Sequence, residues 1–489
     1  MKNFHPPPAI KMLLLLIVLL SAAFWAPNPP YIEDAVTRSA ASGFGIHIPP
    51  GRIVFEPFLG PLLFFLRADQ ALLVYLFLAF WSMVAFLAGR MLHEKRTRSR
   101  WSDAIRTGFA QGVLWLPVIL ILFVATMLFI LFSPLPSNTI THNDPDVVLV
   151  NFHSHTYNSH DGVISPWRLI DWHERNGFDA FFLTEHNHHT ITLELAQQQI
   201  DSLLPPAPLL LVGQEYSGSN HLLLLGLIRP FNSKDYSDQA AIDTAHAHGG
   251  AAVLAHWFAP GKRTRPLMHY VTAGVDGFEI ANQAEGIYYP GRYMQQLHTV
   301  AREQSLLLIG SVDYHGYGPA CFAWNALHIP GWRTRSRSDQ SEAIMDLLRS
   351  RDQSRLQVLL YRDRERIASG LEWLSPFITV LDYFRSLNLW QMLSWLLWFV
   401  VLRLSLYFAP RIPDQLRLRY QTRDILAIAG AGAATITLLF GLWMLAQTPL
   451  LLDENRVFME YGAWLTALGT ILFFYCINLL RKLKKMQLF

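Results

Sequence analysis

Five apolar runs of membrane-spanning length divide this chain of 489 residues. About 20 consecutive apolar residues suffice to cross a bilayer, and such runs occupy about residues 71–90, 113–133, 389–408, 425–446 and 461–480. A sixth, shorter run at 12–26 is either a first span or a secretory signal peptide. Apolar residues make up 52% of the chain and charged residues only 16%, which is too apolar for an ordinary soluble protein.

Positive charge is concentrated in three short segments next to these runs. Lys and Arg cluster after the run at 71–90, before the run at 425–446 and in the C-terminal tail. Because cytoplasmic loops carry an excess of Lys and Arg, this asymmetry predicts a multi-pass protein of a bacterial-type plasma (inner) membrane, with residues 134–388 on the extracytoplasmic, periplasmic side. The lipid bilayer is therefore one expected partner, whereas a net charge of +3 gives no reason to expect nucleic-acid binding.

The segment between the apolar runs differs from its flanks. Sixteen of the nineteen histidines lie between His142 and His328. In that segment, strand-length apolar runs alternate with helix-like segments, and this alternation predicts parallel strands joined by right-handed crossovers. We therefore expect an α/β domain, closed as a (βα)-type barrel, over residues 147–370, between membrane regions at 1–146 and 371–489.

A histidine or a carboxylate follows one predicted strand after another. In chain order these side chains are His153, His155, His160, Asp161, Glu185, His186, Glu215, His221, His256, Glu279, Asp313 and His315. The C-terminal strand ends of such a barrel form one face, so most of the set should converge there. Imidazole and carboxylate ligands without thiolates suit Zn, Mn or Fe, and the set is large enough for two or three divalent ions. Glu279 is as readily a supporting residue as a ligand, and His246 and His248, two apart on a predicted helix, are interpreted as structural.

Six short motifs occur in a fixed order between residues 147 and 330: His153-Ser-His155-Thr with Asp161-Gly162, Thr184-Glu-His186-Asn, Gly213-Gln-Glu215, His221, His256 and Asp313-Tyr-His315. This order resembles that of the polymerase-and-histidinol-phosphatase (PHP) superfamily. The resemblance implies a distorted (βα)7 TIM-like barrel, here flanked by transmembrane helices, and a multinuclear metal centre that hydrolyses phosphoesters. Carried over residue by residue, it implies the metal ligands His153, His155, Asp161, His186, Glu215, His221, His256, Asp313 and His315, with catalytic roles for Asp161, His186 and His256.

Three positions depart from the family pattern. Many relatives have an aspartate at the position of His160, but the spacing of Asp161 matches the third histidine of the histidinol phosphatase branch. Asp161 is therefore favoured, and His160 is the alternative. The usual Thr-Asp-His is Thr184-Glu185-His186 here, and the usual His-Pro is His256-Trp257. These last two differences predict a substrate pocket unlike that of the soluble members.

The resulting hypothesis is a membrane-anchored phosphoesterase that acts through a metal-bridging hydroxide at a di- or trinuclear centre. Lys262, Arg263 and Arg265 follow the His256 strand by a few residues and would bind phosphate there, although a solvated loop explains this trio equally well. The alternative hypothesis is a non-catalytic metal-binding sensor or receptor domain. Nothing in the sequence chooses among a phosphorylated small molecule, a lipid phosphoester and another envelope phosphoester as the substrate.

Overall fold

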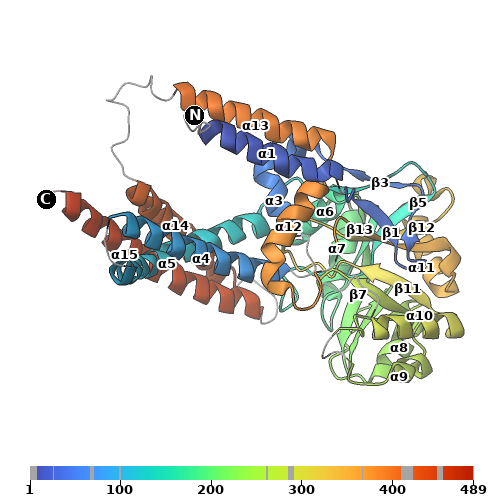
Figure 1. The fold of residues 1–489 in the computed structure, drawn as a ribbon. Helices are drawn as coiled ribbons and strands as arrows, with labels where there is room; N and C mark the ends of the chain where they lie inside the picture. The colour runs from blue at the N-terminus through green and yellow to red at the C-terminus, as the bar shows by residue number, and fades with distance from the viewer. Residues whose placement is uncertain are drawn as a thin grey trace.

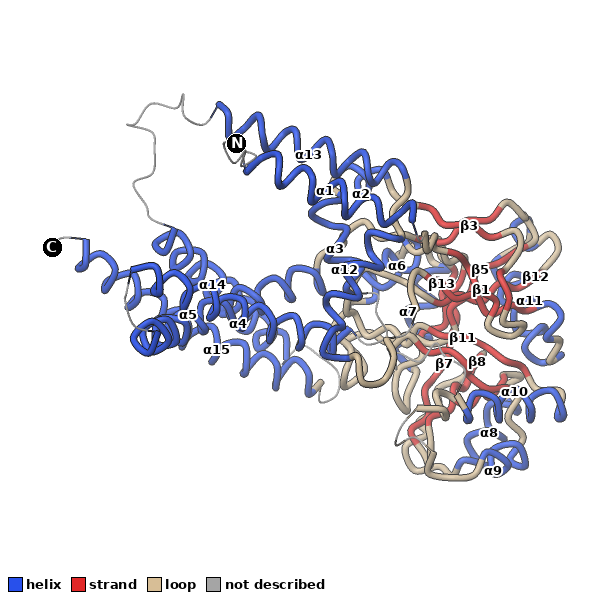
Figure 2. The backbone as a smooth tube through the Cα atoms, in the orientation of Figure 1, coloured by secondary structure: helices blue, strands red, loops and turns tan. Residues whose placement is uncertain are grey.

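The structure of the chain is a computed structural model that describes residues 8–25, 27–66, 71–97, 101–259, 261, 263–284, 291–365, 367–408, 422–448 and 455–487. A domain built on a β-sheet lies at one end, and long helices extend from it in two groups (Figure 1). One group contains α1 and α13, and the other contains α4, α5, α14 and α15. Figure 2 shows the same separation between an almost wholly helical part and the part that holds the strands.

The domain is mixed α/β and is built on an 11-stranded sheet in the order β11-β10-β9-β8-β7-β6-β5-β12-β13-β1-β2. Its strands, in sheet order, are β11 (Leu307–Ser311), β10 (Gly277–Asn282), β9 (Ala251–Leu254), β8 (His221–Leu225), β7 (Leu209–Ser217), β6 (Ala180–Leu183), β5 (Val147–Asn151), β12 (Ala323–His328), β13 (Leu356–Arg362), β1 (Tyr31–Asp34) and β2 (Ser39–Ala40). Two further strands, β3 (Phe44–His47) and β4 (Thr139–His142), form a separate pair.

The predicted parallel pairing is correct for two parts of the sheet. Strands β5, β6 and β7 pair in parallel, as do β9, β10 and β11. It is wrong for β8, which is antiparallel to both of its neighbours, and for β12, β13, β1 and β2, which pair antiparallel. Only residues 218–220 separate β7 from β8, and a connection this short permits a hairpin but no crossover helix.

The sheet does not close into a ladder-bonded barrel within the described part of the chain. Where β11 approaches β5 and β12, the Asn325 side chain donates to the Val150 carbonyl (3.0 Å) and accepts from the Gly310 N–H (2.7 Å). Just beyond the strand ends, the Asp313 N–H donates to the His153 carbonyl (3.0 Å) and the His155 N–H to the Tyr314 carbonyl (2.9 Å). A buried amide thus takes the place of a continuous ladder, because its side chain satisfies the backbone groups between the two edges.

The helices that follow the strands pack against the sheet through apolar faces. They are α6 (Pro166–Arg175), α7 (Thr190–Ile200), α8 (Asp238–Ala247), α9 (Leu267–Ala273), α10 (Arg292–Gln304) and α11 (Arg337–Ser350), with short 3-10 turns at Trp332–Thr334 and Gln353–Arg355. The Ser165 and Ser237 hydroxyls cap α6 and α8 by accepting a backbone N–H. Strand β5 is buried at every position, as expected where a parallel sheet is covered on both faces.

Among the described residues, four helices are long and apolar enough to cross a membrane, and their apolar parts are Gly112–Phe132, Leu389–Phe408, Arg423–Gln447 and Arg456–Lys484. They belong to α5 (Trp101–Phe132), α13 (Leu389–Phe408), α14 (Thr422–Gln447) and α15 (Arg456–Gln487). The predicted run at 71–90 lies in α4 (Ala71–Thr97), and the run at 12–26 in α1 (Pro8–Trp25); both are helical, but their described apolar parts are shorter.

Three short helices and one turn connect the helical part to the domain. They are α2 (Pro50–Val54), α3 (Glu56–Leu66), α12 (Ser375–Arg385) and the 3-10 turn Glu372–Leu374. Leu16, Leu20 and Ala23 of α1 pack with Tyr383 and Phe384 of α12, so the N-terminal helix is part of the packed structure. The basic loop predicted before residue 425 lies largely outside the described residues.

Candidate metal centre

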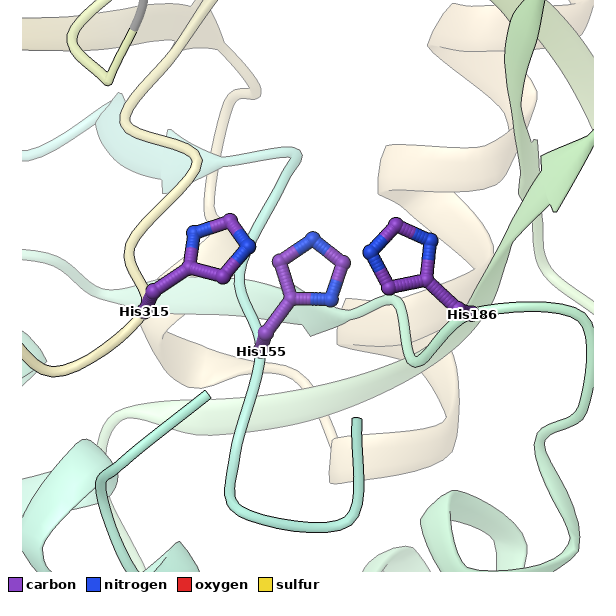
Figure 3. Close-up of side chains that lie close together, drawn as sticks. All are labelled: His155, His186 and His315. Carbon is purple, nitrogen blue, oxygen red and sulfur yellow. The ribbon is translucent and has the colours of Figure 1, made fainter. Parts of the chain in front are cut away.

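The nine predicted ligands converge at one edge of the sheet. His153 and His155 follow β5, His186 follows β6, Glu215 lies near the end of β7, His221 begins β8, His256 follows β9, and Asp313 and His315 follow β11, while Asp161 comes from the loop after β5. An isolated parallel bridge pairs His186, beyond the end of β6, with Glu215 of β7. Figure 3 shows the rings of His155, His186 and His315 side by side.

The innermost part of the cluster consists of four buried side chains. The Nε2 atoms of His153 and His155 each lie 3.2 Å from Glu215 Oε2 and 3.2 Å from Asp313 Oδ1. His153 Nε2, His155 Nε2 and Asp313 Oδ1 are buried without a hydrogen-bond partner. Metal–ligand bonds of about 2.0 Å in tetrahedral geometry require ligand atoms about 3.3 Å apart. These four side chains therefore fit a divalent cation.

Glu215 lies at the centre of the larger cluster and uses both of its oxygens. Oε1 accepts from His221 Nδ1 (2.6 Å) and lies 3.2 Å from His256 Nε2. Oε2, which belongs to the innermost group, also lies 3.2 Å from His186 Nδ1. A carboxylate with imidazoles around each oxygen is suited to bridge two neighbouring ions.

A third group lies at the outer edge. Asp161 Oδ2 is 3.2 Å from His186 Nε2 and 3.3 Å from His315 Nε2. His160 Nε2 lies 3.6 Å from the same oxygen, and its side chain is 55% exposed. The structure therefore places Asp161 between two other predicted ligands and His160 on the solvent side of it, where both can take part in one site.

Two further residues, Glu279 and Asn282, contact the innermost group from behind. Glu279 Oε1 lies 3.2 Å from His153 Nδ1, and its Oε2 accepts from the His256 N–H (2.8 Å) and from Asn282 Nδ2 (3.0 Å). Asn282 Nδ2 also donates to Asp313 Oδ2 (3.1 Å). Such contacts behind the ligands fix their rings and raise their basicity. The structure thus gives Glu279 a supporting position, and the sequence did not single out Asn282.

Glu185, the unusual residue of the Thr-Glu-His motif, holds a turn instead of reaching the centre. Its carboxylate accepts short hydrogen bonds from the hydroxyls of Thr156 and Ser159, and a further one from the Thr156 N–H (3.2 Å). Ser159 Oγ in turn lies 3.1 Å from His155 Nδ1. The longer side chain of glutamate therefore connects the loop after β5 to the ligand His155.

Opposite effects act on the ionisation of these groups. Burial lowers the pKa of His186 to about 4, which leaves its imidazole neutral at pH 7. Burial also opposes charge on His153, but the Asp313 and Glu215 carboxylates raise its pKa well above its usual range. Against the effect of burial, the imidazoles of His221 and His153 hold the pKa of Glu215 well below its usual range, and those of His153 and His315 do the same for Asp313. The carboxylates are thus ionised, and the centre attracts positive charge, whether protons or metal ions.

The backbone is strained at two of the predicted ligands. His256 has φ of 27° and Asp313 has φ of 51°, and residues other than glycine rarely adopt such positive values. Strain of this kind persists where the surrounding structure imposes it, and it is common at functional sites. Here it accompanies the convergence of both side chains on the centre.

Of the predicted basic trio, the structure describes Arg263 and Arg265. Arg263 donates to the carbonyls of Phe258 (2.5 Å) and Ala259 (2.9 Å), and its guanidinium lies 3.8 Å from the centre of the Tyr293 ring. Within the described part of the chain, no recorded bond joins Arg263 or Arg265 to a predicted ligand, and Lys262 lies outside the described residues.

His246 on α8, interpreted from the sequence as structural, takes no part in the centre. Its Nε2 lies 2.8 Å from Asp276 Oδ2, with which it forms a hydrogen bond. A second histidine without a strand-end position, His173, is fully buried and donates from Nδ1 to the Leu169 carbonyl (2.8 Å). Both rings are thus satisfied locally.

A scan against protein-family models gives no match, and a search of curated proteins gives none. Solved structures similar to part of the chain include a two-domain protein from Bacteroides vulgatus ATCC 8482 that contains a predicted PHP-like metal-dependent phosphoesterase; the identity is 19% and the TM-score 0.35, over 43% of this chain and 64% of that one. A putative metal-dependent phosphoesterase from Bifidobacterium adolescentis is 17% identical with a TM-score of 0.28, over 35% of this chain and 88% of that one. An amidohydrolase from Chromobacterium violaceum is 17% identical with a TM-score of 0.28, over 39% of this chain and 96% of that one. The chain thus spans less than two thirds of the first of these proteins, and the interpretation of the site rests on its own geometry.

Proposed function

We propose that the chain is a membrane-anchored, metal-dependent phosphoesterase of PHP type. The observation that carries the proposal is the buried innermost group of His153, His155, Glu215 and Asp313. In this group, the Nε2 atom of each histidine lies 3.2 Å from one oxygen of each carboxylate. Together with Asp161, His186, His221, His256 and His315, this group offers ligands for two or three divalent ions. The resemblance in motif order to the PHP superfamily favours a phosphoester as the bond that is hydrolysed.

Different residues of the chain would have different roles in this reaction. Bound divalent ions would supply Lewis acidity toward a phosphoryl oxygen and make a coordinated water more acidic. Glu279 and Asn282 hold His153 and Asp313 in place behind the centre. Asp161 is the most exposed of the nine predicted ligands, with 32% of its side chain accessible, and therefore lies where a substrate would enter.

The proposal includes the location of the domain. Four helices are long and apolar enough to cross a membrane, and the distribution of Lys and Arg in the sequence favours an extracytoplasmic domain. Labelling of an Asp144→Cys variant in intact cells with a membrane-impermeant maleimide tests this orientation, because Asp144 is exposed while Cys321 and Cys476 are buried. Labelling only after the cells are opened would place the domain in the cytoplasm.

The enzymatic part is tested by metal analysis and hydrolysis assays on the full-length protein. Wild type, His155→Ala and Asp313→Ala are compared on a panel of phosphomonoesters and phosphodiesters, with His47→Ala in β3, an exposed position away from the cluster, as the control. We expect both ligand variants to lose metal and activity and the control to keep them. Metal bound without any activity that depends on these residues would favour the alternative, a non-catalytic sensor.

A further inference from the structure

The predicted ligands differ in their exposure. The side chains of His153 and His155 have no exposed area, whereas Asp161, His221 and His315 are 32%, 25% and 18% exposed. Asp161 and His315 lie in the loops at 156–163 and 314–318, which the Val163 N–H joins by donating to the His315 carbonyl (2.8 Å). A substrate that approaches along this edge therefore passes these two loops first.

The first of these loops is attached to a membrane helix. Asn455 immediately precedes α15, is buried, and donates from Nδ2 to the carbonyls of Tyr157 (3.0 Å), Ser159 (2.8 Å) and Gly162 (2.8 Å). Its Oδ1 accepts from the Phe458 N–H (3.1 Å) and so caps the helix. One side chain thus connects the start of α15 to the loop that carries Asp161.

The second loop contacts two more membrane helices. The Gly318 N–H donates to the Leu131 carbonyl (2.8 Å) near the end of α5. Tyr317 lies against Phe132 of α5, with ring centres 5.9 Å apart, and belongs to an apolar cluster that also contains Met444 of α14. The ends of α5, α14 and α15 therefore support the open edge of the centre.

Exposed aromatic side chains indicate where the bilayer surface lies. Trp443, Tyr461 and Trp464 are 44%, 52% and 74% exposed, near the ends of α14 and α15 that face the domain. Trp and Tyr concentrate at membrane–water interfaces. Tyr461 and Trp464 follow Asn455 by six and nine residues, which is about 9 and 14 Å along a helix. Because the headgroup layer adds about 5–8 Å to each side of the hydrocarbon core, the loop bound by Asn455 lies at the level of the headgroups or just above them.

Tyr317 occupies the space between the centre and this aromatic layer. It follows the predicted ligand His315 by two residues and packs against the apolar cluster that contains Met444 of α14 and Phe458 of α15. Tyr317 thus connects the loop that carries a predicted ligand to the helix ends that carry the aromatic layer.

We infer that the substrate is a phosphoester carried by a membrane lipid, which reaches the centre from the bilayer surface; this rests on the proposed phosphoesterase activity. The open edge of the centre, the anchored loops and the aromatic layer all lie on one side of the domain. A substrate confined to the bilayer beside an anchored enzyme is presented at an effective concentration in the millimolar range. A freely diffusing phosphoester has no such advantage at this edge.

The test compares lipid and water-soluble phosphoesters with the same headgroup. Full-length protein loaded with Mn or Zn is reconstituted in phosphatidylcholine vesicles that contain dioleoyl phosphatidic acid or dioleoyl phosphatidylglycerol. The matched soluble substrates are glycerol 3-phosphate and glycerophosphoglycerol at the same total concentration. Products are followed by phosphorus NMR, and Asp313→Ala supplies the background. We expect hydrolysis of phosphatidic acid or phosphatidylglycerol to be about tenfold faster or more than that of its soluble counterpart, because of effective concentration.

The possible failures are distinct. Hydrolysis of a soluble counterpart that depends on Asp313 and equals or exceeds that of the lipid would overturn the lipid inference and leave the phosphoesterase proposal standing. Hydrolysis of no phosphoester above the Asp313→Ala background would overturn both. A second readout uses vesicles in which the lipid substrate is diluted with a non-hydrolysable ether–phosphonate analogue. The total concentration of the lipid substrate in the sample is kept constant, so that only its surface fraction changes. Below saturation, the rate must fall with the surface fraction of substrate, and a constant rate would contradict a substrate taken from the bilayer.

Discussion

The contact between α15 and the loop that carries Asp161 can be weakened at a single atom. Asn455→Asp removes the amide hydrogens that bind the carbonyls of Tyr157, Ser159 and Gly162, but keeps the oxygen that caps α15. The amide has two hydrogens, and each buried partner left unsatisfied costs about 1–3 kcal/mol. Two unsatisfied partners at the lower end of that range cost about 2 kcal/mol, which is more than tenfold in an equilibrium constant. Relaxation of the loop recovers part of this cost, so we expect the affinity for an ion next to Asp161 to fall by about tenfold.

The assay is a metal titration against a competing chelator, with thermal unfolding measured on the same detergent-solubilised samples. Asn388→Asp is the matched control, because the Asn388 oxygen accepts from the Gln391 N–H (3.0 Å) at the start of α13 and has the same capping role away from the metal centre. The control should bind metal like wild type. Asn455→Asp should lose metal affinity, while its unfolding temperature in the absence of metal stays close to that of the metal-free control, because both caps are kept.

The refuting result is a normal metal affinity in Asn455→Asp. It would mean that the loop at 156–163 holds its position without α15, and that the contact between α15 and this loop has no effect on the site. A large drop in unfolding temperature together with the lost affinity would point instead to general destabilisation.

Three further predictions concern the centre and the domain. Glu279→Gln, which removes the negative charge 3.2 Å from His153 Nδ1, should weaken metal binding by about 10–100-fold at unchanged fold, and an unchanged titration curve would contradict it. Chelation should lower the unfolding temperature, since binding at 100 times Kd adds about 2.7 kcal/mol; identical melting curves with and without metal would argue against a bound ion. The hydrogen bond to Asp276 raises the pKa of His246 above 6.5, so its contribution to stability is complete below pH 6.5 and is lost as pH rises through the raised value. Burial alone would raise the pKa of Asp276, but hydrogen bonds from His246 and its other partners hold it below 3.8, so this contribution is present above pH 3.8 and lost as pH falls. The stability difference between wild type and His246→Ala, followed by denaturant unfolding, should therefore be largest between these two pH values, and a difference independent of pH would refute the ion pair.

The predicted positions of the nine ligands follow from local patterns. An apolar run followed by histidine or a carboxylate, as at His153 and Asp313, marks the end of a buried strand, and parallel strand ends meet at one edge of a sheet. That geometry does not depend on the details of packing, and the structure brings all nine side chains together. The apolar runs at 113–133, 389–408, 425–446 and 461–480 were likewise readable from length and composition alone, and each lies in a helix of spanning length.

Other features depend on contacts between residues that are distant in the sequence. The position of Glu215 between two groups of imidazoles and the support of Asp313 by Asn282 arise only when separate strands are brought into register. The open ladder, with Asn325 between its edges, replaced the closed barrel expected from the alternation of strands and helices.

The sequence by itself determined that this protein has helices long and apolar enough to span a membrane, around an α/β domain rich in side chains of metal-binding type. Periodicity and residue type carry that information, because each is a property of neighbouring residues. Only the tertiary structure decided that Asn455 meets the carbonyl of Gly162, 293 residues earlier in the chain. A buried amide can satisfy any carbonyl within reach, so its partner is set by the way that α15 packs against the domain and by no local pattern.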